Sequence, residues 1–289
     1  MNHQLPLVCQ RWREHRSLYR PAGEPIDPSE FDVSPINVTE AKPFVCLHHY
    51  SSSFPATRFQ FGLFRHGILS GVAIFSMPMS SRVLTNVFPG NPRDSVELGR
   101  LVLLDSVKAN GESWFFARCR ELLRREHIRG IIAFSDDTPR TTIDGRVTLV
   151  GHLGTVYCPS NALYLGRSTA RIHRLLPNGP ILSPRSISKI RNGERGWRYA
   201  SQILVEAGAT PPADNRDLKS WLAQWITIIT RPLKHRGNHR YAWSLHRRIL
   251  PVGAALPYPK TFRTAKDLSR SKERTANERP PQKASQGFD

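Results

Sequence analysis

The sequence predicts an α/β fold in which a mixed sheet is flanked by helices. Residues 59–78 contain two short apolar runs around a glycine turn, and residues 110–127 have the apolar spacing of a helix. Residues 130–137 form a short apolar run directly after that helix. Strands and helices that alternate in this way pack as a sheet covered by helices. A hydrophobic content of 39% in 289 residues is enough for a packed core.

The first predicted core elements are three strands. "FQFGLFRHGILSGVAIFSMP", residues 59–78, is typical of two short strands joined around His66 and Gly67 as a hairpin. "SVELGRLVLLD", residues 95–105, is the third strand, and its uninterrupted apolar end indicates burial on both faces.

A helix and two further strands follow. In residues 110–127, Asn110 is the expected N-cap, Glu112 favours the first turn, and one face is apolar: Phe115, Cys119, Leu122 and Leu123. "GIIAFSDD", residues 130–137, is a buried strand, and "GHLGTVYCPSNALYLGR", residues 151–167, is a strand that runs into a turn. The centre of the fold is therefore a strand–loop–helix element.

Composition divides the chain into a core and appendages. Around residues 192–193 we expect two helices within residues 183–209, whereas residues 217–230 fit either a helix or a strand. The tail is rich in Pro, Ser, Lys and Arg, which is typical of disorder. The predicted parts are an extended N-terminal segment, a catalytic core, a basic and largely helical C-terminal region, and a disordered tail: residues 1–42, 43–180, 181–256 and 257–289.

Positive charge is concentrated in the last third of the chain. The formal net charge is +19, of which residues 1–180 carry +6 and residues 181–289 carry +13. A surplus of this size favours a polyanionic partner, and double-stranded DNA is the partner we expect. The alternative for the last 30 residues is a solvated basic tail with no specific partner.

Other features favour a cytoplasmic protein. No apolar run is long enough to cross a membrane, and "MNHQLPLVCQRWREHR" lacks the apolar stretch of a secretory signal. The four cysteines lie tens of residues apart without a CxxC pair, which indicates free thiols rather than a zinc site or disulfides.

"CLHHYSSSFPA", residues 46–56, concentrates groups that exchange protons or form hydrogen bonds. It fits either a polar turn between two buried elements or the wall of an active site. His48 and His49 point in opposite directions if the segment is extended, so at most one of them faces a given site. No serine lies in a GxSxG elbow, which gives no support to serine-hydrolase chemistry.

Two more stretches could bind or transform a ligand. At "LLDSVKANGESW" a helix start with Lys108, Gly111 and Ser113 could hold a phosphate or carboxylate, or it could be an ordinary capped loop. In "FSDD", Asp136 or Asp137 at the end of a strand could act as a base, orient a histidine, or cap a turn.

"GHLGTVYCPSN" offers an imidazole and a phenol. Tyr157 lies two residues after Thr155, on the same face of the predicted strand. The glycines on either side of His152 would let a ligand approach the backbone closely. The alternative for His152 is a buried, hydrogen-bonded histidine.

The basic segment "RPLKHRGNHRYAWSLHRR", residues 231–248, is the predicted contact with DNA. Its charges could neutralise phosphates while Tyr241 and Trp243 stack on bases. The alternative is a basic amphipathic helix that packs these aromatic residues on the core. The predicted DNA-binding residues are Lys234, Arg236, Arg240, Arg247 and Arg248.

Taken in order, these motifs resemble the Mom family of phage DNA-modification proteins, a divergent branch of the GCN5-related N-acetyltransferase (GNAT) fold. The resemblance rests on "HHYSSSFPA", "GLFRHGILSGVAIFS.P", "ELGRLVLLDSVKANGESWFFARC", "FSDDTPR" and "GHLGTVYCPSNALYLGR", and covers roughly residues 44–167. It implies an α/β, GNAT-like fold with a basic helical C-terminal extension. It also implies addition of a carbamoylmethyl group to N6 of adenine in DNA, which protects phage DNA from restriction.

The resemblance also assigns roles to residues. The implied donor is acetyl-CoA or a related acyl or glycine-derived compound. The resemblance assigns Arg100 and Ser113 to its site, and Lys108 and Gly111 of the helix start complete the expected binding residues. An iron ion is implied at His49, Tyr50 and Asp136. The implied catalytic residues are His49, Tyr50, Ser113, Asp136 and Tyr157.

Two other functions remain open at this point. The chain could be an acetyltransferase for a small amine or a protein, in which case it would bind CoA and show no preference for DNA. It could instead be a GNAT-like protein that binds DNA without catalysis. DNA binding would then survive the combined loss of Asp136, His49 and Ser113.

Overall fold

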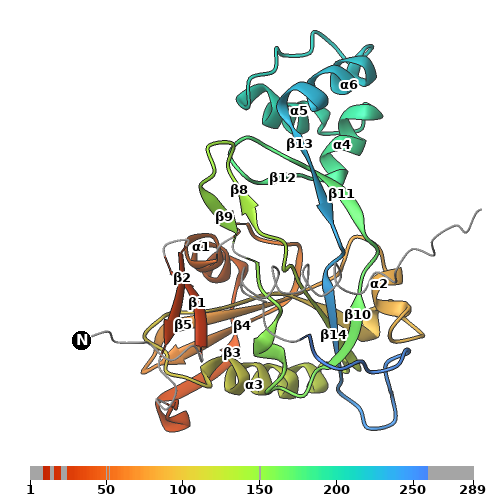
Figure 1. Cartoon of the computed structure of the whole chain (residues 1–289). Helices are drawn as coiled ribbons and strands as arrows, with labels where there is room; N and C mark the ends of the chain where they lie inside the picture. The colour runs from red at the N-terminus through yellow and green to blue at the C-terminus, as the bar shows by residue number, and fades with distance from the viewer. Residues whose placement is uncertain are drawn as a thin grey trace, which may run out of the picture. The chain divides into compact units, whose positions relative to one another are not determined.

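In the computed structural model a seven-stranded mixed sheet forms the centre of the chain (Figure 1). The structure describes residues 9–13, 16–20, 25–49, 51, 53–149 and 151–259. The strand order is β10-β14-β7-β6-β5-β4-β3, and only β6 and β7 are parallel neighbours. The strands are β3 (Phe31–Pro35), β4 (Thr57–Arg65), β5 (Ile68–Ser76), β6 (Ser95–Leu103), β7 (Gly130–Ser135), β10 (Leu163–Arg167) and β14 (His239–Ser244).

The predicted hairpin is confirmed. β4 and β5 pair antiparallel, and the two residues between them are His66 with φ 49° and Gly67 with φ 79°. A two-residue turn with positive φ at both positions matches the twist of the flanking strands. The hairpin therefore forms where the sequence places a glycine between two apolar runs.

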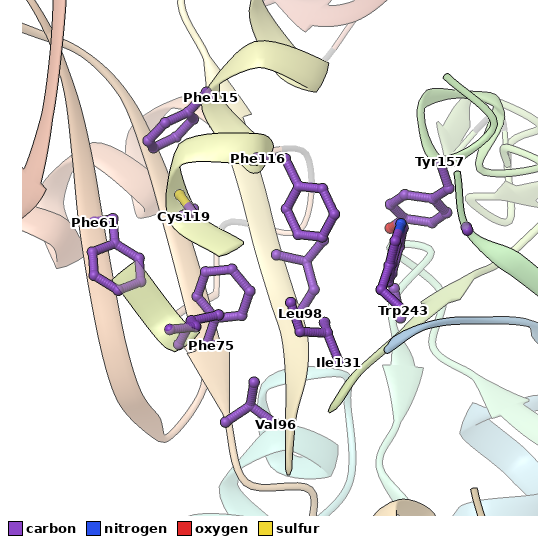
Figure 2. Close-up of a cluster of buried hydrophobic side chains, with 14 of the residues drawn as sticks. Phe61, Phe75, Val96, Leu98, Phe115, Phe116, Cys119, Ile131, Tyr157 and Trp243 are labelled. Carbon is purple, nitrogen blue, oxygen red and sulfur yellow. The ribbon is translucent and has the colours of Figure 1, made fainter. Parts of the chain in front are cut away.

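Helices cover both faces of the sheet because the apolar residues of β5 alternate. Val72 and Ile74 are buried against helix α1 (Val38–His48), whereas Ala73 and Phe75 are buried with helix α3 (Gly111–Arg125) on the opposite face. Figure 2 shows the cluster on the α3 face. The predicted α/β architecture of a mixed sheet flanked by helices is confirmed, with α3 linking the parallel pair β6 and β7.

The C-terminal basic segment returns to the sheet. The amphipathic helix that is the alternative for residues 231–248 does not form: β13 (Arg231–His235) and β14 lie there instead. β14 inserts between β7 and β10, where Tyr241 and Trp243 are 1% and 2% exposed. Burial of large aromatic side chains on the sheet outweighs the helical spacing of the charges. With β3 at the other end, the sheet thus extends beyond residues 43–180.

A separate group of helices lies between β12 (Ile181–Leu182) and β13. The two helices predicted in residues 183–209 are confirmed, and residues 217–230 contain a third helix. They pack around their own apolar core, which includes Ile190, Trp197 and Leu222. The helices are α4 (Pro184–Arg191), α5 (Trp197–Glu206) and α6 (Leu218–Ile229).

Short elements complete the described chain. β11 pairs with both β12 and β13 to form a three-stranded sheet. Cys46, Cys119 and Cys158 are free thiols. Within the described ranges, no helix is both long and apolar enough to pass through a bilayer. The remaining elements are β1 (Cys9–Arg13), β2 (Arg16–Arg20), β8 (Arg140–Thr141), β9 (Val147–Leu149), β11 (Arg171–Leu175), β12 (Ile181–Leu182), α2 (Arg82–Thr85), η1 (Pro28–Glu30), η2 (Pro92–Asp94) and η3 (Thr155–Tyr157).

Candidate functional site

Strands β6 and β7 separate toward their carboxyl ends, and several predicted site residues lie there. The parallel register pairs Ser95–Leu98 with Gly130–Ala133, whereas β6 continues to Leu103 and β7 to Ser135. Beyond this point β7 remains paired with β14. Open α/β sheets commonly bind ligands outside the carboxyl ends of their strands, where the chain direction leaves room.

One side of the site is a hydrogen-bonded chain from His49 to β6. Nδ1 of His49 lies 2.8 Å from Oγ of Ser51 and accepts the Ser51 backbone N–H at 3.1 Å. Oγ of Ser51 lies 3.0 Å from Oγ of Ser53. Arg100 of β6 donates to the Ser53 carbonyl at 3.2 Å and to Ser53 Oγ at 2.9 Å. The predicted histidine and arginine thus belong to one connected group.

The surroundings of His49 keep its imidazole neutral at neutral pH. Burial, the positive charge of Arg100 and the nearby His152 lower the pKa of His49 to about 3. Because Nδ1 accepts the Ser51 N–H, the proton of the neutral ring is assigned to Nε2. His49 is therefore a hydrogen-bond donor at Nε2 in this arrangement, and not a ready base there.

This pKa predicts that acid destabilises the fold. The folded-state pKa of His49 is about 3, below the ordinary value of 6.5, so the unfolded chain binds the extra proton between those values. The free energy of unfolding should therefore decrease as the pH falls from 6.5 toward 3. We expect the melting temperature of His49→Gln to depend less steeply on pH than that of the unmodified chain, measured by thermal denaturation between about pH 7.5 and pH 4.5.

His66→Asn is the matched control, because His66 is an exposed turn residue and asparagine tolerates its positive φ of 49°. Its melting curve should follow the unmodified chain at every pH. Parallel pH profiles for His49→Gln and the unmodified chain would contradict the assignment.

The other side of the site is built on Asp136, directly after β7. Oδ1 accepts the Thr138 N–H at 2.9 Å and lies 2.9 Å from Nε2 of His235, while Oδ2 forms an ion pair with Arg140. Burial alone would raise the pKa of Asp136, but these hydrogen bonds and the charge of Arg140 lower it overall. Asp136 is therefore a carboxylate fixed between cationic and polar partners.

Asp137 forms a second network beside the first. Its two oxygens accept hydrogen bonds from Arg167, one of them at 2.9 Å, and Nε2 of His239 lies 3.2 Å from Oδ2. Nδ1 of His239 lies 2.8 Å from the Tyr164 hydroxyl. Although burial acts to raise it, the bonds from Arg167 and His239 lower the pKa of Asp137 to about 2. This network ties β10 and β14 to the end of β7.

The "GHLG" loop lies against these aspartates and is not a strand. Gly151 has φ 80°, and a Cβ there would come within 2.7 Å of the Asp137 carbonyl carbon. Gly154 has φ 73°, and a Cβ there would come within 2.7 Å of the Tyr157 ring. The strand predicted from residue 151 is wrong because these backbone conformations are left-handed, so that the strand begins only at Leu163.

The loop places a second histidine at the site. The His152 N–H donates to the Asp136 carbonyl at 2.7 Å. Burial lowers the pKa of His152, while the charges of Asp136 and Asp137 act in the opposite direction. Tyr157 is 8% exposed, with its ring centroid 4.9 Å from Tyr241. Tyr157 therefore belongs to the core, where it supports the loop.

The predicted helix start is confirmed, with Asn110 as the N-cap of α3. Lys108 is exposed and Gly111 is buried in the first turn. Oγ of Ser113 donates to the Asn110 carbonyl at 3.0 Å, so that this hydroxyl is engaged within its own helix turn. The junction combines an exposed amine with the positive end of a helix, which suits an anionic group.

The five predicted DNA-binding residues do not form one surface. β14 runs antiparallel to β7, so its first residues lie beside the carboxyl end of β7 and its last residues beside the start. Lys234 and Arg236 are exposed and come just before the start of β14, which lies beside the end of β7 and Asp136. Arg247 and Arg248 are exposed beyond the opposite end. Arg240 is half-buried and donates to the Leu165 carbonyl at 2.7 Å.

The aromatic residues between these charges do not reach a nucleic acid. Trp243 is 2% exposed, and its Nε1 donates to the Ser160 carbonyl at 3.0 Å. Tyr241 is 1% exposed and its hydroxyl donates to the Leu153 carbonyl. The prediction that they stack on bases is wrong, and the alternative that they pack on the core is confirmed, on a strand instead of a helix.

No set of ligands for the implied iron ion is assembled among the described residues. The part of the chain that the structure describes contains no group of three or more His, Cys, Asp or Glu residues placed to hold a metal ion. Both oxygens of Asp136 already have partners, and one of these is the cation Arg140. Tyr50 lies outside the described residues. We therefore derive no chemistry through iron.

Several residues of the site were not predicted from the sequence. Arg140 and Arg167 hold the two aspartates, and His235 and His239 contact them from the basic segment. Arg167 ends one of the motifs of the resemblance, and the two histidines flank Gly237 at equal spacing. The signal of the two histidines is weak because their partners lie about 100 residues away, as for His235 and Asp136.

The comparison with solved structures returns N-acetyltransferases, all at low identity and with TM-scores below 0.5. The ribosomal-protein-S18-alanine N-acetyltransferase from Escherichia coli shares 9% identity with a TM-score of 0.33, over 80% of this chain and 99% of that one. A putative acetyltransferase from Pyrococcus horikoshii shares 11% identity with a TM-score of 0.35, over 83% and 99%. A tandem GNAT protein from the clavulanic acid biosynthesis pathway shares 11% identity with a TM-score of 0.32, over 69% and 66%.

A protein-family match covers most of the chain. No curated protein matches the chain. The model of the Mom protein family matches residues 30–260, which include every described strand of the central sheet, both aspartate networks and the helices α4 to α6. This match covers far more than half of the 289 residues. The chain therefore belongs to the Mom protein family.

Proposed function

We propose that this protein is a GNAT-like transferase that modifies a base of double-stranded DNA. The proposed acceptor is the N6 amine of adenine, the proposed group is of the carbamoylmethyl type, and the result is protection of phage DNA from restriction. Membership of the Mom protein family supports the reaction class. The net charge of +19 supports a polyanionic substrate. The proposed place of the reaction is the cytoplasm of the host cell, where the protein would encounter phage DNA.

The observation that carries the proposal is the position of His152 between the polar networks of His49 and Asp136 at the diverging ends of β6 and β7. The His152 N–H donates to the Asp136 carbonyl, and the charge of His152 contributes to the lowered pKa of His49. Fixed donors and acceptors at one point stabilise developing charge at little cost of reorganisation.

The adenine amine needs help from a base. Its lone pair is delocalised into the ring, which makes the amine a poor nucleophile. A base therefore has to accept the N–H proton as the new bond forms. His152 suits this role, because its lowered pKa leaves the imidazole unprotonated at neutral pH. His49, with its proton at Nε2, would donate a hydrogen bond to an oxygen of the transferred group. Asp136 would stabilise the positive charge that His152 acquires.

The target base has to leave the DNA stack to reach these groups. Extrusion of a base costs roughly a few kcal/mol and is compensated by contacts in the enzyme pocket. Phe54 is half-buried and follows Ser53, so it is an aromatic surface within the described part of the segment. Tyr157 is unsuited to stacking because it is packed in the core.

The donor would be acetyl-CoA or a related acyl or glycine-derived compound. Lys108 and the first turn of α3 at Gly111 suit its phosphate groups, and Arg100 lies on the adjoining strand. When bound, such a donor would supply the electrophilic carbon that the amine attacks. The bond from that carbon to its carrier would break as the new C–N bond forms, so that the carrier (the CoA thiolate in the case of a thioester) leaves with the electron pair. Lys234 and Arg236 would contact the DNA backbone beside the site.

Nucleoside mass spectrometry tests the proposal. The chain would be expressed in bacteria, and plasmid DNA would be digested to nucleosides and compared with DNA from cells that express Asp136→Ala. We expect a heavier deoxyadenosine only with the unmodified chain, and its mass identifies the transferred group. A modified thymidine or cytidine would keep the reaction class and reject adenine. Absence of any new nucleoside with soluble, folded protein would reject DNA modification.

A further inference from the structure

The helices α4, α5 and α6 form a small unit with features that the proposed chemistry does not use. Their buried side chains include Ile190, Trp197, Leu204 and Leu222, which contact one another and Leu182 in a cluster separate from the central sheet. A separate apolar core allows such a unit to hold its own surface in a fixed shape.

Helices α4 and α5 are joined as a helix–turn–helix pair. α4 ends at Arg191 and α5 starts at Trp197, and the intervening turn contains Gly193 with φ 60° and Gly196 with φ 87°. Short turns with glycine are typical of this arrangement, in which a third helix supports the pair. Here α6 is the third helix.

The turn is fixed by a single carboxylate. Glu194 accepts a hydrogen bond from the Asn192 amide at 3.1 Å and one from Ser188 Oγ at 3.3 Å. It also forms an ion pair of 2.6 Å with Arg185 of α4. These bonds hold the end of α4 and the turn together, so the start of α5 has a defined position.

The first two turns of α5 present polar and aromatic groups to solvent. The inner face consists of Trp197, Ala200, Ser201 and Leu204. On the outer face Arg198, Tyr199 and Gln202 are exposed, and Tyr199 is 82% exposed. The Arg198 guanidinium lies 4.8 Å from the centre of the Trp197 ring, which restricts its motion. An exposed tyrosine that the packing does not require is a group available for contact.

Over α4, α5 and the turn between them taken together, basic side chains outnumber acidic ones. Arg185 is paired with Glu194. Among the described residues, no ion pair is formed by the other basic side chains of α4 and α5 or of the turn between them, which are Lys189, Arg191, Arg195 and Arg198. Unpaired cations around a surface with hydrogen-bonding groups complement a phosphate backbone with base edges inside the groove.

We propose that the α4–α5 pair reads the DNA sequence, with the start of α5 in the major groove. The proposal rests on the proposed function and adds the element that selects the site of modification. Arg195 and Arg198 contact phosphates, whereas Tyr199 and Gln202 reach base edges. In helix–turn–helix proteins the amino-terminal residues of the second helix make the base contacts, and glutamine pairs in a bidentate way with adenine.

Selection from a random duplex pool, followed by binding measurements with the full chain, tests this assignment. We expect the unmodified chain to enrich a defined sequence. Tyr199→Ala/Gln202→Ala should bind that sequence roughly tenfold to hundredfold more weakly, with an unchanged salt dependence. Arg195→Ala/Arg198→Ala should weaken all duplexes alike and reduce the slope of log K against log salt by about 2.

The matched control is Arg82→Ala/Arg125→Ala, which removes two exposed charges on α2 and α3. It should bind and select as the unmodified chain does. Circular dichroism confirms that each variant folds. If the unmodified chain enriches no sequence, or if the α5 variants select and bind as the control does, the assignment is overturned.

The outcome is independent of catalysis. If no modified nucleoside is found but the α5 variants lose the selected sequence, the α4–α5 assignment stands and the proposed function fails. If modified adenine is found and the α5 variants still select the same sequence, the proposed function stands and the α4–α5 assignment fails.

Discussion

Asp136→Ala is expected to lower the rate of base modification by at least about a hundredfold, because the variant loses the carboxylate at the centre of the site. The change leaves His235, of which only 2% of the side chain is exposed, and Arg140 without their shared partner. It also removes the negative charge beside His152. Initial rates of modified-nucleoside formation on plasmid DNA measure the effect.

Two variants separate chemistry from structure. Asp136→Asn keeps the acceptor for the Thr138 N–H but removes the charge, so its rate should be close to that of the alanine variant. Asp32→Ala is the matched control, because Asp32 is an exposed carboxylate on β3, and its rate should equal that of the unmodified chain. A folded Asp136→Ala protein that modifies DNA at the full rate would exclude Asp136 from the site.

Binding of DNA should survive the same change. A carboxylate repels phosphate, so its removal is not expected to weaken the salt-dependent binding of duplex DNA. Loss of rate with retained binding would reject the non-catalytic alternative. Loss of both would indicate that Asp136 mainly maintains the fold through Arg140 and His235.

The sequence predicts the local elements of the core well because each is specified by neighbouring residues. Two apolar runs around Gly67 specify the hairpin, and the spacing of Phe115, Cys119 and Leu123 specifies α3. Burial patterns of this kind depend on residues within one or two turns. Asp136 is predictable for the same reason, since it directly follows a short buried strand.

Long-range pairing explains what the sequence does not predict. The charges of residues 231–248 fit a helix locally, but Tyr241 and Trp243 gain more by joining the sheet beside β7. His235 and His239 reach the aspartates only after that pairing is made. Gly151 and Gly154 end a predicted strand because the Asp137 backbone and the Tyr157 ring leave no space for a Cβ.

Trp243→Ala is expected to destabilise the protein by about 3–5 kcal/mol, which is typical for loss of a buried tryptophan. The Trp243 ring is 4.7 Å from Phe116 and 5.3 Å from Tyr157, centroid to centroid, so the cavity would lie between Phe116 of α3 and Tyr157 of η3 (Figure 2). The substitution also leaves the Ser160 carbonyl without the hydrogen bond from the indole N–H. Denaturant unfolding measures the difference.

The size of the change distinguishes a core role from a DNA-contact role for Trp243. Trp243→Phe should lose less stability, because an aromatic ring still fills most of the space. Tyr199→Ala is the matched control, since Tyr199 is 82% exposed and its removal should change the free energy of unfolding by no more than about 0.5 kcal/mol. If Trp243→Ala kept full stability and lost DNA binding, the ring would be a base-stacking group, and the burial of β14 in the sheet would be contradicted. We expect the opposite, because Trp243 is 2% exposed and its ring packs against Phe116 and Tyr157, so any effect of its loss on the proposed DNA modification would arise through the packing of the core beside the loop of His152.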